Sequence, residues 1–197
     1  YHLSKILDSY CINDVQLKDG DLLIDCGANV GEINVALKEK DIFVEYIGFE
    51  PDPVTYNCLK INNPESVSNL YNIGLSNEDK EDVLYLDGFG GNSSLLDFGS
   101  NHQISINTKR LDSFDFQKRI KLLKIDAEGL EPEVLEGTQN ILKNIEYITV
   151  DFSPERGTEQ NLTIVDTNSF LYSNKFELVK FSDFRMIGLY KNKEIIK

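Results

Sequence analysis

Polar residues and glycines at regular spacing, Asp25, Gly27, Asn29 and Gly31, form the pattern D-x-G-x-N-x-G. The apolar run of residues 22–24 precedes this pattern, as expected for a buried strand, and a helical pattern follows it. A strand, a tight glycine turn and a helix are therefore predicted. Glycine lets the backbone approach a ligand closely, and the start of a helix offers unpaired N–H groups.

The spacing of the glycines indicates which ligand the turn suits. A dinucleotide-binding turn has the pattern G-x-G-x-x-G, and the glycines here are spaced differently. Asp25 at the end of the strand would repel a pyrophosphate. It suits a positively charged ligand, such as the ammonium and sulfonium groups of S-adenosylmethionine. The alternative is a turn without a cofactor, since many α/β proteins have a glycine turn after a strand.

A second acidic residue, Glu50, follows the next predicted strand at residues 44–49. In nucleoside-binding α/β folds, a carboxylate at this place accepts two hydrogen bonds from ribose hydroxyls. Asp52 and Pro53 then predict the start of a helix, as N-cap and first-turn residue. The alternative is that Glu50 is an acidic residue of a loop exposed to solvent. The glycine turn earlier in the chain argues against this interpretation.

The composition bounds the class of protein. A chain of 197 residues that is 41% hydrophobic and 27% charged is expected to form a single globular domain, residues 1–197. Its 33 acidic and 20 basic residues give a net charge of −13, without a basic run. This charge argues against a nucleic-acid partner.

The cysteines and the hydropathy indicate the environment. Cys11, Cys26 and Cys58 lack C-x-x-C spacing, which predicts neither a disulfide framework nor a zinc site, and we expect reduced thiols and a cytoplasmic location. No apolar run approaches the roughly 18 residues of a membrane span, and no signal peptide is visible. The chain begins at Tyr1 rather than at methionine, so the sequence leaves open whether a segment precedes it.

Strand and helix patterns alternate along the chain, which predicts an α/β fold. A lead-in helix is expected within residues 1–20. Beyond the glycine turn, the patterns predict strands at residues 44–49, 67–73, 121–125 and 147–152, helices at residues 53–62 and 165–174, and a closing antiparallel pair at residues 176–180 and 186–190.

An insertion at residues 78–110 interrupts this alternation. It contains two expected β arms, residues 81–87 and 104–109, and a polar glycine-rich loop at residues 88–94. A second polar loop is expected at residues 153–164. Such segments over a sheet edge commonly form a lid or a substrate wall.

The motifs, in their order along the chain, resemble the FkbM family of S-adenosylmethionine-dependent methyltransferases. The segments that carry the resemblance are residues 24–31, 48–51, 108–112 and 124–129, with Glu136 and Gly137. It implies a Rossmann-like class I methyltransferase fold, with a mostly parallel seven-stranded sheet, a C-terminal antiparallel hairpin and a small β insertion. It also implies O-methylation of a hydroxyl on a sugar, a polysaccharide or a small metabolite.

The resemblance further implies which residues bind the cofactor. They are Asp25, Gly27, Asn29 and Gly31 around its methionine part, Glu50 at the ribose, Asn72, Gly74 and Leu75 near the adenine, and Asp126 at the end of the fourth strand. Glu32 stands where the family often has an aromatic residue, so the resemblance does not define the pocket surface at this position.

Methylation of a hydroxyl calls for a base, and Asp126, Glu128 and His102 are the candidates. The alternatives are that Asp126 binds the cofactor's amino group, that Glu128 caps the next helix, and that His102 is a surface residue. Arg156 could pair with an anionic group of the substrate. No metal site is predicted, because the spacing of Asp126, Glu128 and Asp151 does not define one.

Other classes of function stay open at this point. A non-catalytic cofactor-binding subunit of a larger assembly would keep the same pocket. An NAD-dependent oxidoreductase is disfavoured by the missing G-x-G-x-x-G, and a nucleic-acid methyltransferase by the net charge.

Overall fold

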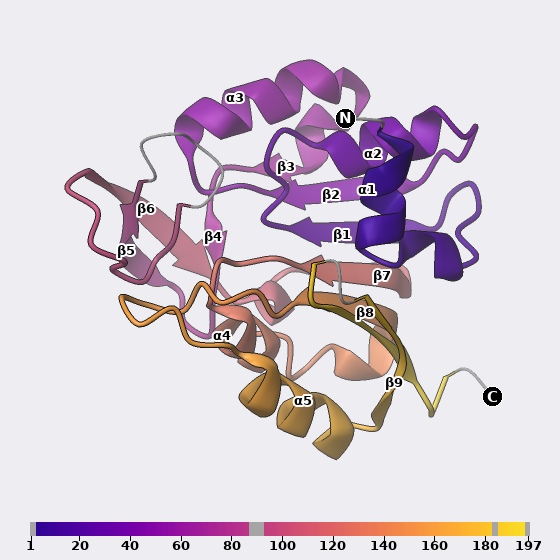
Figure 1. The fold of residues 1–197 in the computed structure, drawn as a ribbon. Helices are drawn as coiled ribbons and strands as arrows, with labels where there is room; N and C mark the ends of the chain where they lie inside the picture. The colour runs from indigo at the N-terminus through magenta and orange to yellow at the C-terminus, as the bar shows by residue number, and fades with distance from the viewer. Residues whose placement is uncertain (1–2, 87–92, 183–184, 196–197) are drawn as a thin grey trace.

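The computed structural model describes residues 3–86, 93–182 and 185–195, and Figure 1 shows the arrangement of its elements. Most of the polar loop predicted at residues 88–94 lies outside the described residues. No helix in the described ranges has the length and apolar character needed to cross a membrane.

The elements alternate as predicted. The α-helices are α1 (Ser4–Ser9), α2 (Glu32–Lys38), α3 (Pro53–Asn62), α4 (Glu131–Glu136) and α5 (Ile164–Ser173). The strands are β1 (Leu22–Cys26), β2 (Glu45–Phe49), β3 (Leu70–Tyr71), β4 (Gly74–Leu75), β5 (Lys80–Tyr85), β6 (Gln103–Lys109), β7 (Ile120–Ile125), β8 (Ile145–Asp151), β9 (Phe176–Ser182) and β10 (Ile187–Asn192). Short 3-10 helices occupy Ile12–Asp14, Pro64–Asn69, Leu111–Ser113 and Leu142–Asn144.

A seven-stranded sheet of order β3-β2-β1-β7-β8-β10-β9 forms the centre of the fold. Its first five strands pair in parallel, whereas β10 runs antiparallel to both β8 and β9. The predicted fold class, with its C-terminal antiparallel hairpin, is therefore confirmed. The strand order reverses between β1 and β7, and in open α/β sheets ligands bind outside the carboxyl ends of the strands at such a point.

Helices cover both faces of this sheet (Figure 1). Helices α1, α2 and α3 pack on one face, where the apolar side chains of α2 meet Leu23 of β1 and Leu122 of β7. Helices α4 and α5 pack on the other face, against Ile24 and Leu123. Both sides of β1 and β7 are thus buried, which explains why their sequences read as continuous apolar runs.

The start of α3 agrees with the sequence. Pro53 is its first residue, and the Asp52 carboxylate accepts a hydrogen bond from the backbone N–H of Val54 at 2.7 Å. A side-chain acceptor at this place satisfies a backbone donor that has no partner within the helix. This cap fixes the turn that follows Glu50.

The strand predicted at residues 67–73 is wrong in its extent. Only Leu70 and Tyr71 pair with β2, and residues Pro64–Asn69 form a 3-10 helix instead. Pro64 fixes φ and has no N–H to donate to a strand ladder, which favours a helical turn at this place. The apolar spacing of the segment therefore misled the strand assignment.

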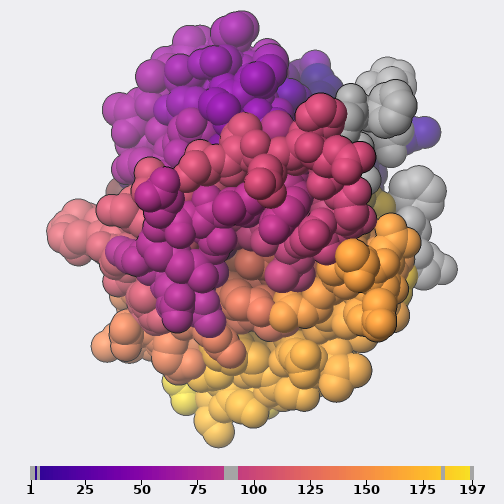
Figure 2. Space-filling model, turned by 90° about the vertical axis from the view of Figure 1, so that its left-hand side faces the viewer, coloured from indigo at the N-terminus to yellow at the C-terminus, as the bar shows by residue number. Residues whose placement is uncertain are grey.

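Strands β5 and β6 of the insertion form a small sheet with β4, which precedes the insertion, in the order β4-β6-β5. The two expected arms, β5 and β6, pair in antiparallel orientation. Figure 2 shows the end of the molecule toward which β1 and β2 point in Figure 1, and the magenta to pink residues of the insertion spread across its middle. The insertion therefore lies over the carboxyl edge of the main sheet.

Candidate cofactor and active site

A cleft of about 230 Å³ opens at the carboxyl ends of β1, β2 and β7, where the strand order reverses. The glycine turn after β1 forms one wall. Leu75 of β4 and Leu84 and Leu95 of the insertion form another, and the acidic segment after β7 lies opposite. An enclosed apolar wall that faces convergent charged groups is typical of a small-molecule site.

The turn after β1 requires glycine at two places. Gly27 has φ +71°, and a Cβ on it would lie 1.9 Å from the backbone oxygen of Asp126. Gly31 has φ +78°, and a Cβ there would lie 2.1 Å from Nδ2 of Asn63. Asn29, between them, is also left-handed with φ +48°. The two glycines let the turn pack directly against the end of β7 and against α3.

Glu50 joins the glycine turn to the end of β2. Its Oε2 accepts a hydrogen bond from the backbone N–H of Asn29, and its Oε1 accepts one from the backbone N–H of Asp52, both at 2.9 Å. The side chain is buried in the cleft wall, and this burial raises the pKa of Glu50 to about 7 despite the two N–H donors. A carboxylate accepts several hydrogen bonds, so Glu50 has capacity left for ligand hydroxyls.

This pKa makes a testable prediction for ligand binding. The ionised carboxylate accepts hydroxyl donors better than the protonated carboxyl, so affinity for S-adenosylhomocysteine should rise as the pH passes upward through about 7. If only the ionised form binds, the gain from pH 6 to pH 8 is about tenfold. Calorimetric titration at several pH values measures it. The Glu50→Gln variant should bind more weakly and lose this gain, and an equal pH dependence in the variant would contradict the assignment.

The residues predicted near an adenine divide into two sets. Gly74 and Leu75 line the cleft, together with Ile73. Asn72 does not line it, because its amide donates to the backbone oxygens of Glu50 and Pro51, both at 2.9 Å. Asn72 therefore holds the turn that carries Glu50, and the structure gives it no direct place in the cleft.

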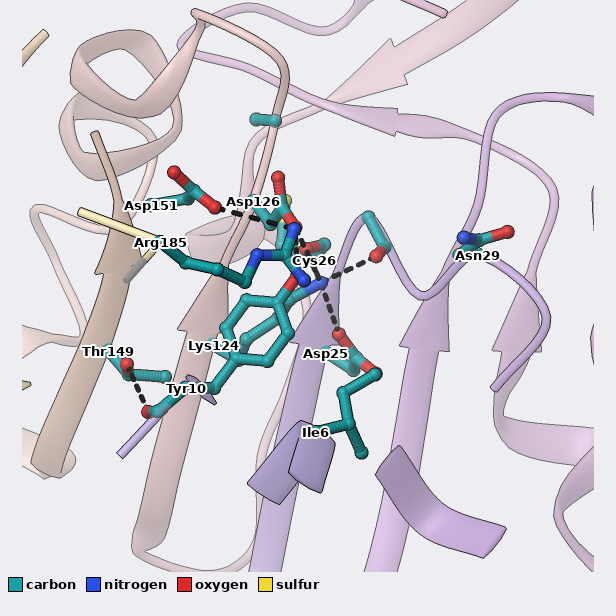
Figure 3. A network of polar contacts seen from close by, with 12 residues as sticks. Ile6, Tyr10, Asp25, Cys26, Asn29, Lys124, Asp126, Thr149, Asp151 and Arg185 are labelled. Atoms are coloured by element: carbon teal, nitrogen blue, oxygen red, sulfur yellow. Dashed lines mark hydrogen bonds and ion pairs between the residues drawn. The ribbon is translucent and has the colours of Figure 1, made fainter. Parts of the chain in front are cut away.

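Asp25 is buried beneath the glycine turn, where Lys124 of β7 neutralises it (Figure 3). The Tyr46 hydroxyl donates to Oδ2 of Asp25 at 2.7 Å, and Nζ of Lys124 lies 3.0 Å from Oδ1 as an ion pair. Nζ also donates to the backbone oxygen of Gly27 at 2.6 Å. Burial lowers the pKa of Lys124, but the Asp25 carboxylate and other nearby negative charges raise it by more, and the net pKa lies well above its usual value. Lys124 thus fastens the turn to β7 as a cation.

Asp126 lies at the mouth of the cleft among groups from distant segments (Figure 3). The hydroxyl of Tyr10, which ends α1, donates to Oδ2 of Asp126. Arg185 lies over the Tyr10 ring at 4.7 Å, and its Nη2 is 3.8 Å from Oδ2 of Asp126 and 3.7 Å from Oδ2 of Asp151. Burial and the Asp126 charge raise the pKa of Tyr10 well above its usual value, so Tyr10 is a neutral hydrogen-bond donor.

The structure brings Glu128 and Glu155 to Asp126. Carboxylate oxygens of these residues lie within 4.8 Å of one another. Glu128 has φ +51°, and its backbone oxygen accepts a hydrogen bond from Oγ of Ser94 at 2.7 Å. Burial and the Asp126 charge raise the pKa of both glutamates. The cleft therefore ends in a concentrated group of carboxyls.

Other residues named from the sequence lie elsewhere. His102 is exposed directly before β6 of the insertion and does not line the cleft, so we no longer regard it as a candidate base. Arg156 is engaged by Glu133 of α4 in a bidentate pair of 2.6 and 2.9 Å, which removes it as a free anion-binding group. Glu32 does line the cleft, and burial raises its pKa.

Sequence reasoning missed Tyr10, Lys124, Glu155 and Arg185. Lys124 carried a signal, because a lysine inside the apolar run of residues 120–125 must be buried and paired. The other residues lie in a lead-in segment and two loops, and only the folded chain brings them together.

Comparison with known proteins agrees with this geometry. A model of the methyltransferase FkbM domain matches residues 25–182. The chain belongs to the FkbM methyltransferase family. The resemblance inferred from the motifs is confirmed, and with it S-adenosylmethionine as the cofactor of the family.

Curated relatives of this FkbM domain are methyltransferases by name. Methyltransferase 1 of Beauveria bassiana is 27% identical over 155 residues, which cover 64% of this chain and 62% of that protein. Methyltransferase sdnD of Sordaria araneosa is 26% identical over 171 residues, which cover 68% of this chain and 66% of that protein. The matched region thus spans slightly less than two thirds of either relative.

Solved structures share the fold. A Streptococcus pneumoniae protein assigned as a tRNA (m1A22) methyltransferase, in complex with S-adenosyl-L-methionine, has a TM-score of 0.57 at 14% identity over 95% of this chain and 72% of that chain. The TrmK protein of M. capricolum, in complex with S-adenosyl-homocysteine, has a TM-score of 0.52 at 10% identity over 94% and 69%. These likenesses establish the Rossmann-like methyltransferase fold.

Proposed function

We propose that this FkbM domain is the catalytic domain of an S-adenosylmethionine-dependent methyltransferase that methylates a hydroxyl oxygen of a sugar, a polysaccharide or a small metabolite. One observation carries the proposal. The glycine turn, Glu50 and the carboxyl groups of Asp126 and Glu128 border the same cleft at the carboxyl ends of β1, β2 and β7. Recognition groups for a nucleoside and candidate bases for a reaction are therefore neighbours.

The residues of the cleft suit the parts of the cofactor. The turn from Gly27 to Gly31 would hold the methionine part, with Asp25 acting through Lys124 and the backbone rather than by direct contact. Glu50 would accept the ribose hydroxyls, and the apolar wall at Gly74 and Leu75 would receive the adenine. Asp126 would border the cofactor at the end of β7.

The bound cofactor supplies an electrophilic methyl group on its sulfonium sulfur. The protein must hold the acceptor oxygen in line with the methyl carbon and the sulfur, about 3 Å from the carbon, and this positioning supplies much of the rate. The bond from oxygen to the methyl carbon forms as the bond from that carbon to sulfur breaks. The hydroxyl proton would pass to the carboxyl pair formed by Asp126 and Glu128, and the products would be the methyl ether and S-adenosylhomocysteine.

The walls of the cleft would select the acceptor. The insertion, residues 78–110, and the loop at residues 153–164 border the open side, as does the Tyr10 end of α1. The net charge of −13 disfavours a nucleic-acid acceptor. A cytoplasmic location remains a prediction.

A turnover assay tests the proposal. Methyl-labelled S-adenosylmethionine is incubated with the chain and a panel of sugars, oligosaccharides and hydroxylated metabolites, and label transfer is counted. We expect transfer to at least one hydroxyl acceptor, and a Glu128→Gln loss in kcat of about a hundredfold or more. Glu136→Gln, on α4 outside the cleft, is the matched control and should retain the wild-type rate. Tight S-adenosylhomocysteine binding without turnover on any acceptor would instead support the non-catalytic subunit.

A further inference from the structure

We propose that Asp126, Glu128 and Glu155 bind a divalent cation, with Asp151 as a further ligand from the end of β8. The site lies at the acidic end of the cleft, across the segments that follow β7 and β8. The inference deepens the proposed function, on which its catalytic consequence rests. Binding of the cation itself is tested without any acceptor.

The geometry of the three carboxylates suits one ion. One oxygen from each lies within 4.8 Å of the others. Ca²⁺ binds oxygens at about 2.3–2.6 Å, so ligands on opposite sides of it are about 5 Å apart, and ligands at right angles are closer. The group needs only small side-chain movements to close around a cation. Its oxygen ligands, without histidine or cysteine, favour Mg²⁺, Mn²⁺ or Ca²⁺ over Zn²⁺.

A separate observation comes from Asp151. Its side chain is 1% exposed, and among the described residues its Oδ2 has no hydrogen-bond partner. Figure 3 shows the Arg185 guanidinium beside Asp126, with a dashed line that marks its ion pair with Asp151. The nearest guanidinium nitrogen is 3.7 Å from Oδ2 of Asp151, too far for a hydrogen bond. A buried carboxylate oxygen without a donor is costly, and a cation bound beside it would remove that cost.

The balance of charged side chains around Asp126, Glu128 and Glu155 also favours a bound cation. Lys124 and Arg185 are the cations whose charged groups lie within 4 Å of a carboxylate at this end of the cleft, in the part of the chain that the structure describes. Nζ of Lys124 lies 3.0 Å from Asp25 and 3.7 Å from Asp126. Lys124 therefore compensates mainly the negative charge of Asp25. Glu128 and Glu155 have no ion pair with either cation among the described residues. A divalent ion would balance the carboxylates that these cations leave uncompensated.

The consequence for methyl transfer follows from general metal chemistry. A cation held at this end of the cleft binds the acceptor hydroxyl and lowers its pKa, because it stabilises the developing alkoxide. Bond making and bond breaking at the methyl carbon are unchanged. The cation adds orientation of the acceptor and makes loss of its proton easier.

Binding of Mn²⁺ to the metal-stripped full chain tests the proposal. Electron paramagnetic resonance of the free ion and calorimetric titration measure the stoichiometry and affinity, with and without S-adenosylhomocysteine, and MgCl₂ and CaCl₂ titrations serve as competitors. We expect one Mn²⁺ per chain and a loss of affinity of at least about tenfold in Glu128→Gln and in Glu155→Gln. Glu159→Gln removes the same charge from an exposed position in the loop that carries Glu155, and it should bind Mn²⁺ as the wild type does.

A measurement on the unaltered chain covers the case in which a variant fails to fold. Tb³⁺ occupies oxygen-rich Ca²⁺ sites, and Tyr10, which is hydrogen-bonded to Asp126, would sensitise its emission. Saturable Tb³⁺ emission that Ca²⁺ reverses would support the site. No Mn²⁺ binding at millimolar concentration, with or without S-adenosylhomocysteine, would overturn it, as would Mn²⁺ binding that both Glu128→Gln and Glu155→Gln leave intact. The carboxyls would then be held by shared protons or by the cofactor's ammonium group.

Discussion

Replacing Gly27 with alanine should destabilise the domain by at least about 3 kcal/mol, the size expected when a side chain overlaps fixed backbone at a strained φ. The added Cβ would lie 1.9 Å from the backbone oxygen of Asp126, and φ is +71°. The turn would have to leave the end of β7, which would also open the cleft. Urea unfolding measures the loss of stability, and S-adenosylhomocysteine titration measures the loss of the site.

Gly20 offers the matched control for this change. Its φ of +79° is similar, but nothing lies within 4 Å of a Cβ built on it. Gly20→Ala should therefore lower the free energy of unfolding only by the cost of the left-handed backbone, about 1–2 kcal/mol, and should leave ligand affinity unchanged. Equal losses of stability in the two variants would show that the close approach of Gly27 to the Asp126 backbone is not what requires glycine.

Lys124→Met should cost about 3–5 kcal/mol of stability near pH 8, because it leaves the Asp25 carboxylate buried without its cation. The loss should shrink as the pH falls, since burial already raises the pKa of Asp25 and protonation removes the unpaired charge. Thermal and urea unfolding across pH 5 to 8 measure both effects.

The double variant Lys124→Met with Asp25→Asn tests the pairing directly. A neutral amide can still accept the hydrogen bond from Tyr46, so most of the lost stability should return. A double-mutant cycle then gives a coupling energy of several kcal/mol between the two sites. Losses that simply add would contradict the ion pair as the fastening of the glycine turn.

Local sequence signals were enough for the framework of the site. The D-x-G-x-N-x-G turn, the cap formed by Asp52 and Pro53, and the buried apolar runs of β1 and β7 each depend on neighbouring residues. The order of these elements then placed Asp25, Glu50 and Asp126 at one edge of a parallel sheet. The family match over residues 25–182 confirms the family that these motifs indicated.

The acidic end of the cleft was beyond such reasoning. Glu155 and Arg185 lie in loops after β8 and before β10, and Tyr10 ends a helix at the other end of the sequence. No periodicity links these positions, and they meet because β10 inserts beside β8 in the sheet. The placement of His102 was equally beyond such reasoning, since loop geometry decides whether a histidine faces a cleft, and His102 does not line this one.

The central claim is that the cleft binds an adenosyl cofactor through Glu50 and the glycine turn, and calorimetric titration with S-adenosylhomocysteine and NAD tests it most directly. We predict one S-adenosylhomocysteine per chain, no NAD binding, and an affinity loss of about 10- to 100-fold in Glu50→Gln, as expected when a charge-assisted hydrogen bond is weakened. Glu45→Gln, at the other end of β2, should bind normally. NAD binding, or an unchanged affinity in Glu50→Gln, would contradict the account.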